Sequence, residues 1–210
     1  MIRKKEIKER TIKYIKNNLK EYILIVLIFF IGFFAGIIAI NNGKEENLNK
    51  MSSYVMDFIE KFKKIEDINE EEIALESIKN NLMLTFKIWL AGTTIIGLPV
   101  VLGFVAFRGF CLGYTVSCIY YTLGIQKTLI FCLSNLFLQN IIFIPAILTL
   151  GVSSYKLCKA IINDRRKENI KLEIAKHTLV SFFISILLIA SSIIENEVSI
   201  RLLKLVIQFL

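Results

Sequence analysis

Carboxylates and histidine are scarce where this sequence is most apolar. The chain has 18 Asp and Glu residues, yet its long apolar runs contain none, and its one histidine is His177. Intramembrane proteolysis by paired aspartates and proton relays need acids inside the bilayer. Histidine-rich metal sites and most Ser-His or Cys-His schemes need more histidine than one. The sequence therefore argues against an enzyme and predicts neither a metal nor a cofactor.

Cysteine is also sparse and unpatterned. The four cysteines show no CxxC pair and no spacing typical of metal ligands. Three of them, Cys111, Cys118 and Cys132, lie inside apolar segments, and the fourth is Cys158. We interpret them as small apolar residues rather than as a disulfide framework or a metal site.

Apolar residues dominate what remains. The 210 residues are 55% hydrophobic, and between Trp89 and Val152 the only charged side chains are Arg108 and Lys127. As a helix this stretch would extend about 96 Å, about three times the hydrocarbon thickness of a bilayer. We therefore predict an all-α polytopic membrane bundle in which the two charges mark turns.

The hydropathy pattern predicts one membrane domain with five transmembrane helices. The expected spans are residues 22–40, 86–107, 109–124, 128–152 and 177–194. The first is longer than a signal-peptide core and no A-x-A cleavage site follows it, so we expect a retained anchor. The remaining parts are a basic segment over 1–21, a polar segment over 41–81, a basic loop over 153–176 and an interfacial tail over 195–210.

The basic residues predict the orientation. With the N-terminus in the cytoplasm, the inner parts hold 16 Lys and Arg residues and the outer parts hold 9. Positive charge collects on the cytoplasmic side of membrane proteins. Topology and attraction to membrane lipid therefore explain the net charge of +8 without a nucleic-acid partner, and five spans place the C-terminus outside.

The outer segment 41–81 has helical periodicity. Its apolar residues recur at helical spacing and form one stripe: Val55, Phe58, Ile59, Phe62 and Ile65. A second helix is expected to begin at Asn69, with Glu72 placed as in a capping box. The first helix either rests on the outer headgroups or docks a partner, and Phe58, Phe62 and Ile65 are the candidate contact residues.

Small residues and prolines predict how the helices pack. Two GxxxG pairs, Gly32 with Gly36 and Gly109 with Gly113, let helix backbones approach closely. A homo-oligomer is also compatible with the sequence. We expect Gly97 with Pro99 to bend the second span, and Pro145 to bend the fourth.

Polar side chains inside the spans have structural and functional interpretations. The fourth span contains a polar patch: Ser134, Asn135, Gln139 and Asn140. Hydrogen bonding between helices explains it, and a solute path is the alternative. Lys87 and Trp89 are expected as anchors at the outer interface, and Arg108 as an anchor at the inner turn.

The same apolar region carries a family resemblance. The matching segments are Trp89 to Gly92, Ile95 to Pro99, Arg108-Gly109 with Gly113 to Val116, Gln139-Asn140 with Ile144-Pro145, and Ile31-Gly32 with Gly36. In order, spacing and expected topology the chain resembles the stage II sporulation protein M family.

The resemblance implies a membrane scaffold in endospore-forming bacteria. It implies partners, the cell-wall hydrolases called stage II sporulation proteins D and P, which are recruited to the division septum for wall thinning and engulfment. The family offers no catalytic residues to transfer. A scaffold is therefore the expected function, and a small permease or channel component using the polar patch is the alternative.

Overall fold

The computed structural model describes residues 18–64, 70–94, 97–133, 137–163 and 167–207. All regular elements in these ranges are α-helices. They are α2 (Leu19–Asn41), α3 (Glu45–Lys64), α4 (Glu70–Gly92), α5 (Gly97–Phe131), α6 (Phe137–Asn163) and α7 (Lys167–Ile207). The expected all-α membrane bundle is confirmed, with different helix bounds.

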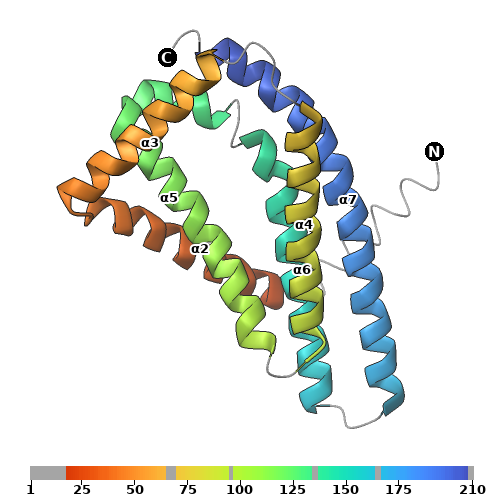
Figure 1. Ribbon diagram of the computed structural model, residues 1–210. Helices are drawn as coiled ribbons and strands as arrows, with labels where there is room; N and C mark the ends of the chain where they lie inside the picture. The colour runs from red at the N-terminus through yellow and green to blue at the C-terminus, as the bar shows by residue number, and fades with distance from the viewer. Residues whose placement is uncertain (1–17, 65–69, 95–96, 134–136, 164–166, 208–210) are drawn as a thin grey trace.

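The helices form two groups that meet near the start of α5. In Figure 1, α2 crosses α5 on one side with α3 beyond the crossing, and α4, α6 and α7 lie side by side on the other. One apolar core joins the groups through buried side chains of five helices, including Ile25 of α2, Ile88 of α4, Val105 of α5, Leu150 of α6 and Leu188 of α7.

Four helices contain a stretch long and apolar enough to cross a membrane. These stretches are Leu19–Asn41, Gly97–Phe131, Asn140–Ile162 and Ile170–Ile193. The described part of α4 does not qualify, since its last 18 residues contain three charged side chains, Glu76, Lys79 and Lys87. The protein is therefore a multi-pass membrane protein, and α4 lies against its spanning helices α6 and α7.

The structure corrects the expected turn at Arg108. This residue lies in the middle of α5, so residues 86–107 and 109–124 are not two separate spans. The guanidinium lies over the ring of Phe143, 4.2 Å from its centroid, so an aromatic face of α6 stabilises the charge inside the bundle. A charged residue in an apolar run therefore did not mark a turn here.

The turn lies instead just after Gly92. Thr93 and Thr94 donate side-chain hydrogen bonds to the carbonyls of Leu90 and Ala91, and Thr94 Oγ1 accepts one from the backbone N–H of Gly97. Hydroxyl side chains that bond nearby backbone groups favour turns and helix starts. Helix α5 begins there.

The two prolines differ: one lies at the start of a helix and the other in a helix interior. Pro99 lies in the first turn of α5, where a missing N–H costs little, so it does not bend a span. Pro145 lies inside α6, as expected. The break in α5 is at Gly124, whose φ of 76° and ψ of 175° are not helical. The third span was expected to end at this same residue.

Helix α2 agrees with the expected span 22–40. Helices α6 and α7 extend beyond the spans that were expected in their place. Helix α6 begins at Phe137 rather than at the expected residue 128, and it continues to Asn163. Much of the expected basic loop 153–176 is therefore helical. Helix α7 includes both the expected span 177–194 and most of the expected tail 195–210. Long basic side chains can reach the interface from the ends of spanning helices, so charges near the ends did not stop these helices.

Candidate interaction surface

Glycine backbones in contact determine how α2 crosses α5. A Cβ atom added to Gly32 would overlap the carbonyl oxygen of Ala106, and one added to Gly36 would overlap that of Phe110. From the other side, Cβ atoms on Gly109 and Gly113 would overlap the carbonyl oxygens of two phenylalanines of α2: Phe29 and Phe33. The two GxxxG pairs therefore face each other, and the helices touch through their backbones.

This crossing places α3 against the far half of α5. The buried Ile59 of α3 packs with Ile119 and Phe131 of α5, and Val55 lies beside them. The hydroxyl of Tyr114 donates a hydrogen bond to the sulfur of Met51, over 3.1 Å. Two members of the predicted apolar stripe are thus used inside the molecule, so the stripe as a whole is not a free docking face.

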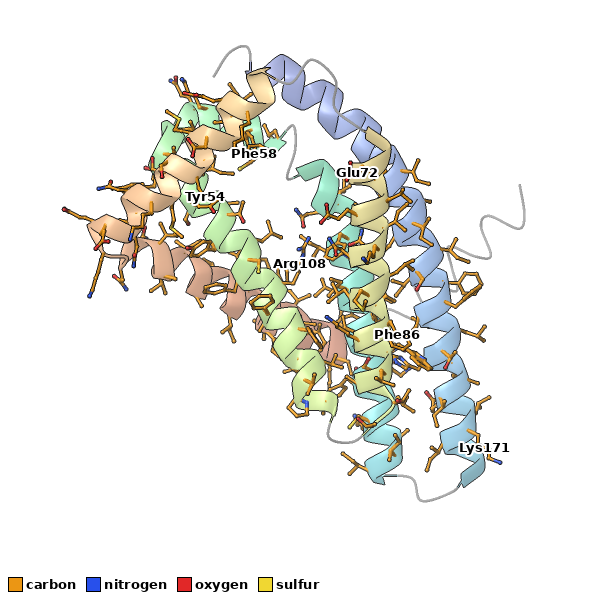
Figure 2. All side chains as sticks on the ribbon, in the orientation of Figure 1. Tyr54, Phe58, Glu72, Phe86, Arg108 and Lys171 are labelled. Carbon is orange, nitrogen blue, oxygen red and sulfur yellow. The ribbon has the colours of Figure 1, made fainter. Side chains whose placement is uncertain are left out.

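A second face of α3 remains exposed. Tyr54 is 81% exposed and Phe58 is 48% exposed, and both are labelled on this helix in Figure 2. Beside Tyr54, a groove of about 530 Å³ runs between α3 and α5 and is lined by Met51, Tyr114 and Cys118. Aromatic and methionine side chains are enriched at protein interfaces, and Met51, which is half-buried, lies on the same side of the helix as the two exposed aromatics. This face, defined by Met51, Tyr54 and Phe58, is called the α3 face.

The sequence prediction of contact residues was incomplete. Phe58 belongs to the α3 face, the side chain of Phe62 is not described, and Ile65 lies outside the described residues. Sequence reasoning missed Met51 and Tyr54. Met51 and Tyr54 lie seven and four residues before Phe58, and this spacing was a usable signal because such residues share one side of a helix.

The predicted interface anchors lie elsewhere than expected. Trp89 and Lys87 are in the last turns of α4 rather than at the start of a span, toward the end of the molecule where α6 ends and α7 begins. The indole of Trp89 donates a hydrogen bond to Thr178 Oγ1 of α7, over 3.1 Å. Trp89 therefore joins two helices.

The predicted polar patch is described only in part. Asn140 is buried in α6, the side chain of Gln139 is not described, and Ser134 and Asn135 lie outside the described residues. The structure does not bring these four residues together as a described site.

Other polar residues join α4, α6 and α7. His177 is 1% exposed, and its Nδ1 lies 2.9 Å from the Oγ of Ser153. Near the opposite end, Asn81 donates a hydrogen bond to the Oγ of Ser192 over 2.8 Å. Sequence reasoning placed His177 at an interface and missed both serines. Polar residues repeat every four positions in α7, at 177, 181 and 185, but this repeat includes neither Ser153 nor Ser192.

The polar contacts described above join one helix to another. Hydrogen bonds between small polar side chains stabilise helix association in lipid. Within the described ranges, no group of three or more His, Cys, Asp or Glu residues could hold a metal ion.

Comparison with known proteins identifies a family. The family model described as Stage II sporulation protein M matches residues 25–200, which include α3 to α6 and most of α2 and α7. No curated protein and no solved structure matches the chain. Because the match spans most of the sequence, the chain belongs to the stage II sporulation protein M family.

Proposed function

We propose that this protein is a non-enzymatic membrane scaffold that holds peptidoglycan hydrolases at the sporulation septum. Membership of the family makes it a sporulation-related membrane protein. The finer proposal is that it recruits stage II sporulation proteins D and P, so that the septal wall is thinned and engulfment proceeds.

The α3 face is the observation that carries the proposal. A helix that only shielded its own apolar stripe would leave polar residues outside, but α3 also exposes Tyr54 and Phe58. Tyrosine supplies a large contact area at low cost in conformational entropy. Such a face suits a protein partner outside the spanning helices.

The position of α3 supports a partner on the cell-wall side. In Figure 1, α3 lies at the end of the molecule opposite to the ends of α6 and α7 at Asn163 and Lys167. Basic residues cluster near those ends: Lys156, Lys159, Lys171 and Lys176. The positive-inside rule assigns that end to the cytoplasm and therefore α3 to the outside, where wall hydrolases act.

Photocrosslinking at the α3 face tests the proposal. A photoreactive residue at position 58 in sporulating cells should crosslink to a wall hydrolase, whereas one at position 59, buried against α5, should crosslink mainly within the chain. If position 58 yields no hydrolase while the protein accumulates normally, docking through this face is excluded.

A matched pair of variants tests function. We expect Tyr54→Ala with Phe58→Ala to reduce hydrolase recovery by about tenfold or more, since interface aromatics often contribute 2 kcal/mol or more. The control is Phe30→Ala with Phe34→Ala, which removes two exposed aromatics at the same spacing from α2. Equal recovery and equal engulfment in both pairs would contradict the proposal.

A further inference from the structure

Helix α5 is longer than a bilayer crossing requires. Its 35 residues would extend about 52 Å as one straight helix, whereas the hydrocarbon core of a bilayer is about 30 Å thick. The part from Gly97 to Gly124 alone extends about 42 Å, which crosses the core with a tilt. The residues after Gly124 therefore lie beyond the crossing.

Two tyrosines mark the level at which the crossing ends. Tyr120 and Tyr121 are half exposed, and they lie four and three residues before the break at Gly124. Exposed tyrosines of spanning helices collect at the lipid headgroups, where the ring contacts apolar chains and the hydroxyl contacts water. The break is thus at the membrane surface, on the side of the molecule that carries α3.

The chain after the break has an apolar outer side. We call residues 125–133 the α5 end segment. Its exposed apolar side chains are spaced by four residues, so they share one side of a helix. Ile125 is 62% exposed, Leu129 is 58% exposed and Leu133 is 64% exposed.

The opposite side of the α5 end segment packs on the protein. Phe131 is buried with Ile59 of α3 and Ile119 of α5. Thr128 is also buried, and its hydroxyl donates a hydrogen bond to the carbonyl of Gly124 over 2.6 Å. In Figure 1 the last turns of α5 leave the direction of the long helix beside α3. The segment is therefore fixed to α3 by its inner side.

We infer that the α5 end segment lies in the membrane surface on the α3 side, with Ile125, Leu129 and Leu133 among the first carbons of the lipid tails. Interfacial helices bury an apolar side about 5 to 10 Å into the boundary between headgroups and tails. The outer side of the segment continues the exposed apolar surface of the α5 span, so the lipid around that span also reaches it. Because Phe131 packs on Ile59, the segment holds α3 at the height of the headgroups.

Tryptophan depth measurements on the full chain in vesicles test this placement. The background variant Trp89→Phe removes the only native tryptophan, and Leu129→Trp places a probe on the outer side of the segment. The vesicles contain phosphatidylcholine with bromine on its tails, either near the headgroup or near the tail end. We expect bromine near the headgroup to quench the probe about twofold more strongly, because an interfacial helix stays in the upper part of the leaflet.

Two control positions calibrate the depth. Phe30→Trp lies at the centre of the spanning stretch Leu19–Asn41, so bromine near the tail end should quench it more strongly. Asp57→Trp lies two positions from the buried Ile59, on the side of α3 away from α5. Acrylamide in the water should quench this second control, and neither lipid should.

A second probe keeps the test valid if Leu129→Trp does not accumulate. Ile125→Trp replaces a side chain on the same outer side of the segment, so a tryptophan fits there without repacking. We expect it to respond to the two lipids in the same order as Leu129→Trp.

Three results would overturn the inference. Quenching of both probes by acrylamide as strong as at position 57 would place the segment in water. Stronger quenching by bromine near the tail end would place it inside the hydrocarbon core. Protection from every quencher would show that protein, such as a second copy of the chain, covers this side in place of lipid.

Discussion

Helices within the two groups contact each other by opposite means. Where α2 crosses α5, four glycines bring the backbones together and leave no room for side chains. Where α4, α6 and α7 meet, side chains of His177, Asn81 and Ser192 fill the space and form hydrogen bonds between helices. The first contact depends on shape alone, and the second also depends on polar chemistry.

The difference predicts how each group responds to change. A backbone contact cannot yield to an added side chain without separation of the helices, so its response is abrupt. A contact made by hydrogen bonds loses a modest part of its stabilising free energy for each bond removed. Since α3 rests on α5 near the glycine crossing, the α3 face depends on the less tolerant contact.

The largest effect is expected for Gly113→Leu. The added side chain would meet the backbone of Phe33, so we expect a loss of about 3 kcal/mol or more in the free energy of unfolding. Thermal unfolding in detergent and accumulation in the membrane measure it. Gly103→Leu is the control, because a Cβ at this position of the same helix meets nothing within 4 Å. Similar losses in both variants would contradict a special role for the crossing.

A smaller effect is expected for Gly124→Ala. No atom lies within 4 Å of the added Cβ, but the φ of 76° with ψ of 175° is a conformation that alanine tolerates poorly. We expect a loss of about 1 to 3 kcal/mol from backbone strain alone. Gly103→Ala should be neutral or slightly stabilising, because alanine favours a helix. If chemical denaturation finds both variants equally stable, the break in α5 does not require glycine.

In the three-helix group, Asn81→Leu should cost about 0.6 to 2 kcal/mol by removing the hydrogen bond to Ser192. A double-mutant cycle with Ser192→Ala isolates the shared bond. Ser185→Ala is the matched control, since its hydroxyl bonds a carbonyl of its own helix, at Ser181. A coupling energy near zero would show that packing, rather than this bond, joins α4 to α7.

The smallest perturbation tests the topology of α4. In a background without native cysteines, we expect Thr94→Cys to be labelled from the same side of the membrane as Lys171→Cys, and Lys61→Cys from the opposite side. The reason is that α4 lies along α6 and α7 and runs toward the same end of the molecule, with Gly92 beside Ser154 and His177. Labelling of positions 94 and 61 from one side would show that α4 does not cross.

This outcome matters for the number of crossings. Four helices qualify as spans by length and composition, and α4 would be a fifth. With five, the C-terminus lies opposite the N-terminus, as the sequence predicts. With four, the two ends lie on one side.

Sequence reasoning succeeded where a single helix carries the signal. The first span agrees with α2, the helix expected from Asn69 agrees with α4 beginning at Glu70, and both GxxxG pairs lie in helices. It failed where the signal depends on a neighbour. Arg108 resembled a turn because the ring of Phe143, which makes its charge tolerable, is 35 positions away.

The α3 face shows the same limit. Periodicity identified one stripe on the helix, but the approach of Ile119 and Phe131 decided which part of it is buried. Spacing alone places Tyr54 and Met51 on the same side of the helix as Phe58, but only the structure shows that both line a groove against α5.

The sequence by itself determined the membrane class, the all-α architecture and the glycines that allow close approach. These properties depend on composition and on local spacing, and both can be determined from the sequence alone. Tertiary structure decided where the chain turns, which glycine pair faces which, and which aromatics remain exposed on α3. Those properties depend on contacts between helices far apart in the chain, and their energies exist only when both partners are in place.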